Sequence, residues 1–293
     1  MQPSDLVRFI ILCAIWGSSF VFIRICAPVF GPVVTAAGRL GLAGLVLLAY
    51  LRATRFDAQW RTHRWTYFKI GWLASGLPFL CFAFGALRLP ASLLSIINAC
   101  TPLFTAIFAA IWLGEAFGPK RIAGMMLGIG GVSLANGFGN VELTPLNLFS
   151  IGVTLLGPMF YGLSGIYIKR CASQLSPQGN AAWSQLSVAP FVFLLTPLSP
   201  PTAWPQPGQW AALAVLAILC SGVAYVLFYR LLADIGPTRA ATITFAIPIF
   251  GMLWGALFLG EQITAGMLTG CGIMISGTWL VVGPGRPRVL KPS

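Results

Sequence analysis

Long apolar runs recur along almost the whole chain, and short polar or proline-containing stretches separate them. Ten such runs are centred near residues 15, 42, 78, 102, 128, 157, 188, 220, 248 and 273. A helix needs about 20 apolar residues to cross the hydrocarbon layer of a bilayer. The runs are continuous and do not alternate residue by residue, so they indicate helices and not the strands of a membrane barrel. The pattern predicts an all-α integral membrane protein with ten transmembrane helices.

The chain also repeats itself. The stretch containing Pro102, Leu113-Gly114-Glu115, Gly124 and Gly131 returns 146 residues later as Pro248, Leu259-Gly260-Glu261, Gly270 and Gly277. A weaker match relates Trp16-Gly17-Ser18-Ser19 and Arg24 to Tyr161-Gly162-Leu163-Ser164 and Lys169. Internal similarity in a hydrophobic chain is typical of transporters built from two related bundles. Because each half has five spans, the second half starts on the opposite side of the membrane, and the repeats are predicted to be inverted.

These repeats define the expected domains. We expect a first repeat over residues 1–140 (spans 1–5), a second over residues 145–285 (spans 6–10) and a cytoplasmic tail over residues 286–293. The longer connections, residues 52–66 and 197–207, are too short for a soluble domain, so function must lie in the bundle. The N-terminal apolar run has no clear cleavage site for a signal peptide, and we expect it to be the first span.

Composition agrees with a membrane protein and explains the charge. With 57% hydrophobic residues, 8% charged residues and a mean hydropathy of +0.85, the chain cannot be an ordinary soluble globule. If the N-terminus is cytoplasmic, one face receives Arg8, Arg52, Arg55, Arg61, Arg64, Lys69, Lys120, Arg121, Lys169, Arg170, Arg230, Arg239, Arg286, Arg288 and Lys291. Only Arg24, Arg39 and Arg88 remain for the outer half.

That distribution predicts that both termini are cytoplasmic, because cytoplasmic loops carry the excess of Lys and Arg. The net charge of +12 is then a signal of topology, and its basic residues are expected to contact membrane lipid. We expect no nucleic acid among the partners.

The sequence contains little that would support a catalytic or a metal-binding function. Gly162-Leu163-Ser164-Gly165 matches the nucleophile motif of rhomboid proteases, but that chemistry needs a histidine base in the membrane, and His63 lies in a loop. No phosphate-binding glycine loop, zinc motif or pair of carboxylates is present. The seven cysteines are scattered singly, as small packing residues are. We expect no enzyme, no metal and no cofactor.

Two prolines lie in the middle of equivalent spans. Pro102 and Pro248 each remove a backbone hydrogen bond and free the carbonyl four residues earlier, at Asn98 and Thr244. Broken helices near the midplane are where transporters expose backbone to substrate, although membrane helices also tolerate proline as a packing kink. The pairing between halves favours a cavity wall with hinges at Pro102 and Pro248.

Polar and aromatic residues follow single faces of several spans, and polar groups in lipid face the bundle interior. Serines and threonines can alternatively bond their own helix backbone or hold helices together. The candidate substrate-binding residues are Trp16, Ser19, Phe79, Asn98, Thr101, Tyr161, Ser164, Tyr225, Tyr229 and Thr244. An interior of hydroxyls, an amide and aromatic rings suits a small, partly apolar solute.

The remaining symmetric residues each have two interpretations. Glu115 and Glu261 either cap helix ends or take part in proton coupling, and no acid lies within a span core. Arg24 and Lys169 either gate opposite mouths or extend to the interface. Gly124-x-x-x-Gly128, Gly251-x-x-x-Gly255 and Gly266-x-x-x-Gly270 are close-packing motifs, within one bundle or between two chains. The protein is accordingly expected to be a monomer or a homodimer.

The residues Trp16-Gly17-Ser18-Ser19-Phe20, the following Arg39 and the repeated proline helix ending in Leu-Gly-Glu resemble EamA domains of the drug/metabolite transporter superfamily. The resemblance covers all ten spans and implies two inverted five-helix EamA repeats around a central cavity. It also implies export of amino acids or other metabolites across the bacterial inner membrane, and YddG-like amino-acid exporters are the most similar type. Leu163 and Gly165 depart from the pattern in span 6.

The sequence therefore predicts a secondary transporter that exports small metabolites, amino acids first among them, by alternating access through a central cavity. Two alternatives stay open. The same bundle would serve a passive facilitator or channel, and the solute could belong to another class, such as a nucleoside, a sugar or a cationic drug.

Overall fold

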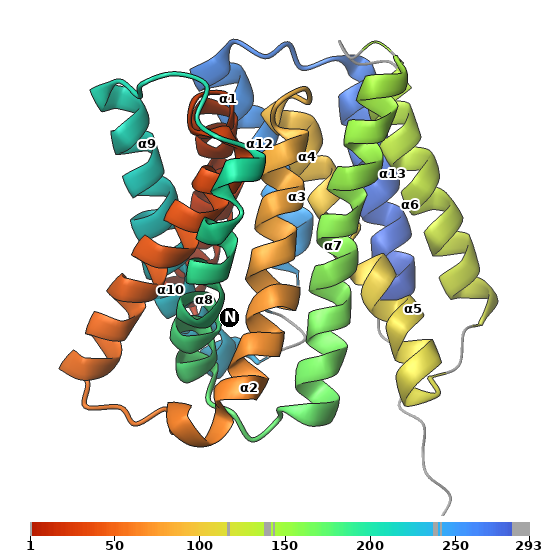
Figure 1. Ribbon diagram of the computed structural model, residues 1–293. Helices are drawn as coiled ribbons and strands as arrows, with labels where there is room; N and C mark the ends of the chain where they lie inside the picture. Colours follow the sequence, from red (N-terminus) through yellow and green to blue (C-terminus); the bar gives the residue numbers. More distant parts are fainter. Residues whose placement is uncertain are drawn as a thin grey trace, which may run out of the picture.

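The computed structural model describes residues 2–115, 118–137, 142, 144–236, 240 and 242–282 of the chain. Within these ranges every regular element is a helix and none is a strand. Figure 1 shows the helices standing side by side along a common direction. The prediction of an all-α fold is confirmed for this part of the chain. Arg239 and the tail 286–293, used above to orient the termini, lie outside the described residues.

Five helical stretches are long and apolar enough to cross a membrane: Pro3–Ala53, Trp60–Gly85, Ala91–Leu113, Pro145–Cys171 and Pro207–Ile235. Two shorter helices, Ile243–Leu259 and Ala265–Val281, are also apolar. A single crossing requires about 20 helical residues. The chain is therefore a multi-pass membrane protein.

The first helix, α1 (Pro3–Ala53), is bent back on itself at Gly31. Gly31 has φ 77° and ψ 155°, a conformation that side chains with a Cβ rarely adopt, and Pro32 follows it. A Cβ at Gly31 would also lie 2.8 Å from the carbonyl oxygen of Ser199. The Thr202 backbone N–H bonds the Val29 carbonyl at 3.0 Å. The bend therefore joins two helical halves, which leave it toward the same face of the bundle in Figure 1.

The next elements contain matching irregular turns. Helix α2 (Trp60–Gly71) passes through the π-helical turn η1 (Trp72–Gly76) into α3 (Leu77–Gly85). In the second half, α9 (Pro207–Ala217) passes through η3 (Ile218–Val223) into α10 (Ala224–Ile235). The two π-helical turns begin 146 residues apart, which is the offset of the sequence repeat. Such turns widen a helix locally and are frequent at functional sites.

The two proline helices differ. The first is interrupted: α4 (Ala91–Asn98) ends before a turn at residues 99–100, and α5 (Thr101–Leu113) begins just before Pro102. In the second half, α12 (Ile243–Leu259) continues on both sides of Pro248. The expected break is thus present at Pro102, whereas Pro248 lies inside one helix. The hinge role of both prolines stays a prediction.

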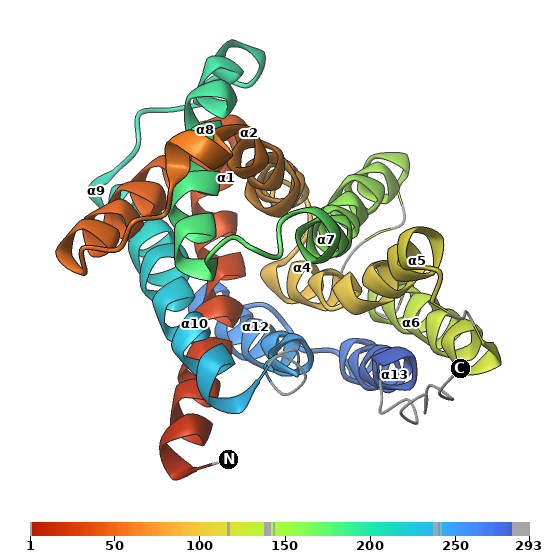
Figure 2. The same cartoon turned by 90° about the horizontal axis from the view of Figure 1, so that it is seen from below.

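The remaining helices are α6 (Pro119–Gly137), α7 (Pro145–Cys171), α8 (Pro177–Leu194) and α13 (Ala265–Val282), with a short 3₁₀ turn, η2 (Thr196–Leu198). Seen along the bundle, α5, α6 and α13 group at one side and α2, α8 and α9 at the other (Figure 2). Helices α1, α4, α7, α10 and α12 surround the region between them.

Helices α6 and α13 pack backbone against backbone. A Cβ added at Gly124 would lie 2.5 Å from the carbonyl oxygen of Gly277, and one at Gly131 would lie 2.6 Å from that of Gly270. The earlier glycine of α6 contacts the later glycine of α13, and the later glycine of α6 contacts the earlier one of α13. These two equivalent helices therefore run antiparallel. Gly124 and Gly270 are members of the predicted close-packing motifs, and in the structure they pack within the chain.

We expect Gly131→Ala to destabilise the protein by roughly 1–3 kcal/mol, because the added methyl group would meet backbone atoms of α13 that cannot move aside. The neighbouring Gly130 provides the matched control, since a Cβ added there would have no neighbouring atom within 4 Å. Gly130→Ala should be neutral or slightly stabilising. Thermal unfolding of the purified variants in detergent measures both effects, and equal melting temperatures would contradict the packing.

Candidate functional site

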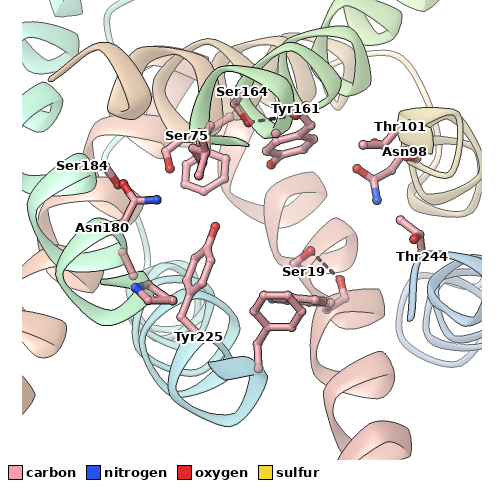
Figure 3. A pocket seen from close by; sticks show the side chains of 18 of the residues that line it. Ser19, Ser75, Asn98, Thr101, Tyr161, Ser164, Asn180, Ser184, Tyr225 and Thr244 are labelled. Atoms are coloured by element: carbon pink, nitrogen blue, oxygen red, sulfur yellow. Dashed lines mark hydrogen bonds between the residues drawn. The ribbon is translucent and has the colours of Figure 1, made fainter. Parts of the chain in front are cut away.

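A cavity of about 530 Å³ lies inside the bundle and is lined from both halves of the chain. Pockets for small molecules are typically about 300–1,000 Å³. The structure brings all ten predicted substrate-binding residues to its wall: Trp16, Ser19, Phe79, Asn98, Thr101, Tyr161, Ser164, Tyr225, Tyr229 and Thr244. Figure 3 shows the side chains of those that it labels converging from separate helices. The predicted hinges Pro102 and Pro248 do not line it.

One wall of the cavity is aromatic. The rings of Trp16 and Tyr225 meet edge to face with centroids 6.2 Å apart, and Tyr225 stacks on Tyr229 at 5.9 Å. Across the cavity, Tyr161 stacks on Phe82 at 6.3 Å. These rings offer apolar faces to a solute, and each tyrosine adds a hydroxyl that can donate or accept a hydrogen bond.

The small hydroxyl groups of the wall bond their own helices. Ser19 donates to the Trp16 carbonyl at 2.6 Å, and Ser164 donates to the Tyr161 carbonyl at 2.8 Å. Thr101 donates to the carbonyl of Asn98 at 2.7 Å. Each of these hydroxyl groups therefore donates its proton to its own helix backbone, as one of the two interpretations of the sequence expected. Their oxygens still face the cavity as hydrogen-bond acceptors.

Equivalent residues of the two halves meet at one end of the cavity. Asn98 and Thr244, which are 146 residues apart, lie close together in Figure 3. Asn98 is half-buried at the end of α4, where the backbone leaves the helix. Its amide combines donors and an acceptor, so this end of the cavity can bond a polar group of either kind.

The structure also places Arg39 in the wall, although it was not among the predicted substrate-binding residues. Arg39 lies on the second half of α1 and is 8% exposed. Its Nε donates to the Ser221 hydroxyl at 2.8 Å, and its guanidinium carbon lies 3.8 Å from the centre of the Phe79 ring. The sequence did contain a signal for this residue, because Arg39 is a basic residue within the core of a span and such residues are rarely without function.

Further polar residues of the wall were not among the predicted substrate-binding residues. Ser75 comes from the π-helical turn η1, and Asn180 and Ser184 come from α8. The side-chain oxygen of Asn180 is buried and has no hydrogen-bond partner among the described residues. The sequence offered no symmetric counterpart for α8 residues, which is why the repeat did not reveal them.

The cavity reaches one face of the bundle. Its lining extends to Ala172, Leu175 and Pro177 in the connection between α7 and α8, which lies at the lower side in Figure 1. At the other end, Phe20 and Phe82 pack edge to face with centroids 5.5 Å apart. The lining therefore extends to residues at the lower face and includes this packed pair of rings at its other end.

Two charged residues, Arg24 and Glu261, connect helices at the upper end through hydrogen bonds. Arg24 donates to the carbonyl oxygen of Ala86 at 2.5 Å. Glu261 accepts hydrogen bonds from the backbone N–H of Ala91 at 2.6 Å and of Ser92 at 3.0 Å, and from the Ser92 hydroxyl at 2.7 Å. These N–H groups begin α4, whose N-cap is Pro90 and has no side-chain cap. Glu261 thus caps a helix of the other half, where the helix dipole favours a negative charge.

The equivalent residues at the lower end make different contacts. Glu115 accepts from Arg121 at 3.0 Å and lies 3.5 Å from Lys169, the counterpart of Arg24. The hydrogen bond from Arg121 lowers the pKa of the Glu115 carboxyl below its ordinary value of 4.5, and the charge of Lys169 adds to this effect. Glu261 is thus a helix cap and Glu115 the centre of an ion-pair group.

Among the described residues, no cluster of three or more His, Cys, Asp or Glu side chains could hold a metal ion. His63 lies in α2 and is absent from the lining of the cavity. Ser164, the serine of the rhomboid-like motif, donates to its own helix backbone. The expectation that the chain is not an enzyme stays a prediction.

Comparison with known proteins identifies the family. A sequence profile of the EamA-like transporter family matches residues 6–137 and again residues 148–283. The chain is 23% identical over 287 residues to the uncharacterized transporter YvbV of Bacillus subtilis (strain 168), covering 94% of this chain and 90% of that protein. It is 23% identical over 281 residues to the uncharacterized inner membrane transporter YedA of Escherichia coli (strain K12), covering 92% and 88%.

The similarity extends to another domain of life and to a solved structure. An uncharacterized transporter of Archaeoglobus fulgidus is 27% identical over 278 residues, covering 91% of this chain and 93% of that protein. A crystal structure with 18% sequence identity superposes with a TM-score of 0.68 and covers 96% of both chains. At that identity the superposition establishes a shared fold.

We expect Glu261→Gln to destabilise the protein, because the amide can no longer accept charge-assisted hydrogen bonds from all three donors of α4. One hydrogen bond to a charged group contributes roughly 1.5–3 kcal/mol. Glu142→Gln is the matched control, since Glu142 is an exposed glutamate near the same face. Thermal unfolding in detergent measures the difference. A melting temperature of Glu261→Gln equal to that of the control would disprove the capping role.

The lowered pKa of Glu115 predicts a pH dependence. A carboxyl whose folded pKa lies below 4.5 stabilises the protein at neutral pH and loses this contribution as the pH falls through the folded pKa. The melting temperature of Glu115→Gln should therefore lie below that of the unmodified protein at pH 7, and the gap should close as the pH falls below 4.5. A gap that stays constant down to the lowest measurable pH would refute this assignment.

Proposed function

We propose that this chain, which belongs to the EamA-like transporter family, is a secondary transporter that exports small metabolites, in particular amino acids, by alternating access. The observation that carries the proposal is one central cavity, lined from both halves, whose lining extends to residues at the lower face and has the packed rings of Phe20 and Phe82 at its other end. The relatives named above are transporters, and a membrane transport role follows from the family.

The proposed topology is ten spans in two inverted five-helix repeats. Three matched features support it, each about 146 residues apart. The π-helical turns η1 and η3 begin at equivalent positions. Gly114 and Gly260, which end α5 and α12, have identical backbone angles of φ 65° and ψ 22°. The glycine contacts of α6 and α13 are symmetric, since Gly124 with Gly277 corresponds to Gly270 with Gly131.

The proposed location is a bacterial inner membrane with both termini cytoplasmic. Figures 1 and 2 place the start of α1 and the end of α13 toward the same face. The ends of the helices on that face carry most of the basic residues that the structure describes, among them Arg52, Lys120 and Arg170. The similarity to a protein named as an inner membrane transporter of Escherichia coli supports the same placement.

Alternating access is supported by the different contacts of equivalent residues. At the upper face Glu261 and Arg24 bond the ends of α4 and α3, whereas Glu115 and Lys169 pair with each other at the lower face. An inverted repeat can reach the opposite state when its two halves exchange conformations. The present state is then the one open to the cytoplasm.

The walls of the cavity support a small zwitterionic or neutral solute. Aromatic faces, the amide of Asn98 and the hydroxyls of Ser19 and Ser164 combine apolar surface with hydrogen-bonding groups. None of the described lining residues is a carboxylate, which favours facilitated transport over strict proton exchange, because proton relays commonly use a titratable acid in the membrane.

Transport into proteoliposomes tests the proposal. We expect Asn98→Leu and Tyr225→Leu to lower the initial rate of labelled amino-acid uptake by about tenfold or more, because a lost hydrogen bond in a buried site costs about 1–3 kcal/mol. Phe193→Leu, at a side chain that is 61% exposed on the outside of the bundle, is the control and should keep the full rate. If both cavity variants transport normally, the cavity is not the substrate path.

The same preparation separates a carrier from a channel. A carrier should show saturation and should take up labelled solute faster when the vesicles contain unlabelled solute. A passive facilitator of the channel type would show neither property. Nucleosides, sugars and cationic drugs in the same counterflow panel test the other solute classes.

A further inference from the structure

We propose that Arg39 is the residue that binds a carboxylate of the transported solute, so that the substrate class is a small molecule with one carboxylate and an apolar body. This inference rests on the proposed function and specifies its substrate. It begins with the position of Arg39, which lies in the wall of the cavity and is 8% exposed. The guanidinium is always protonated, so the cavity permanently contains a positive charge.

No protein carboxylate neutralises that charge within the described residues. The ion pairs of the structure connect Arg8 with Asp5 and Asp234, and Arg121 and Lys169 with Glu115. Glu261 bonds the start of α4. A buried charge without a partner is costly, and proteins normally pair it or place it where a ligand supplies the counter-charge.

The contacts of Arg39 fix its orientation and leave its outer edge available. Nε is held by the Ser221 hydroxyl at 2.8 Å, and the plane of the group lies over the Phe79 ring at 3.8 Å. No hydrogen bond from either terminal nitrogen to a described residue accompanies these contacts. Those nitrogens carry a planar set of N–H donors that matches the two oxygens of a carboxylate.

The rest of the wall separates a carboxylate from other anions. Arg39 is the single Lys or Arg among the described residues that line the cavity. Phosphate groups carry more charge and are usually bound by several cationic side chains, whereas the described wall contains a single one. The aromatic surfaces of Trp16, Tyr161 and Tyr225 suit an apolar body. The buried, unpartnered oxygen of Asn180 is an acceptor that can receive an ammonium group of the same solute.

The test compares ligands that differ only in the carboxylate. The dissociation constants of phenylalanine, phenylalaninamide, 3-phenylpropanoate and 3-phenylpropanamide are measured calorimetrically on the purified full chain in detergent. We expect each carboxylate to bind about tenfold or more tightly than its amide, because a hydrogen bond to a charged group contributes about 1.5–3 kcal/mol. This comparison needs no variant. Amides that bind as tightly as the carboxylates would overturn the proposal.

Variants then assign the preference to one residue. Arg39→Gln should bring the ratio of amide to carboxylate dissociation constants close to one, mainly by weakening the carboxylate. Arg39→Lys should keep part of the preference, because an ammonium retains the charge but lacks the planar set of donors. Arg52→Gln removes an exposed charge from the same helix and should change nothing. An unchanged ratio in folded Arg39→Gln would also overturn the proposal.

The outcomes distinguish this inference from the proposed function. Uptake of amino acids without any preference for the carboxylate would leave the transport function standing and reject the role of Arg39. Binding of 3-phenylpropanoate without transport of any amino acid would support Arg39 and reject amino-acid export. Inorganic phosphate and chloride are tested in the same titration, and tighter binding of either than of every carboxylate would reject the proposed class. Absence of binding by every carboxylate would reject it as well.

Discussion

The hydrocarbon of a bilayer offers no partner to a backbone N–H or C=O group, so each such group must be bonded inside the protein. Helices satisfy this requirement along most of the chain. Where a helix is interrupted, other groups of the protein bond the exposed backbone N–H and C=O groups. At the bend of α1, Thr202 bonds the carbonyls exposed next to Gly31. At the break before Pro102, the Thr101 hydroxyl bonds the carbonyl of Asn98. At the start of α4, Glu261 bonds the free N–H groups.

Irregular backbone inside a membrane protein is stable only next to polar partners, and some of the irregular positions of this chain border the cavity. The break at Asn98 and the π-helical turns η1 and η3 border the cavity, with Ser75 in its wall and Ser221 bonded to Arg39. The same groups that complete the backbone bonding therefore supply the polarity of the cavity. The resulting site consists of polar points on an otherwise apolar and aromatic surface.

Sequence alone located apolar helices and ten residues of the wall. The repeat marked Asn98 and Thr244 as equivalent polar residues, and the structure places both in the wall of the cavity. The partner of Glu261 was beyond prediction, because the helix that it caps begins 170 residues earlier in the other half. The continuous helix through Pro248 was also missed, because proline permits a break but the surrounding packing decides whether one forms. Arg39 was overlooked because counting charges by side ignores the depth of each residue.

If Arg39 binds the carboxylate of the solute as proposed, this lone buried arginine has a consequence for the proposed cycle of alternating access. When the solute leaves, the charge of Arg39 loses its partner inside a region of low polarity, and the empty carrier must change conformation with that charge uncompensated. When a solute is bound, its carboxylate neutralises the guanidinium and the conformational change moves less net charge. In this proposed cycle the energetic difference would make the return of the empty protein the slower step and the exchange of solutes across the membrane the faster one. An acid in the cavity would remove this asymmetry by pairing with Arg39, and the wall that the structure describes contains none.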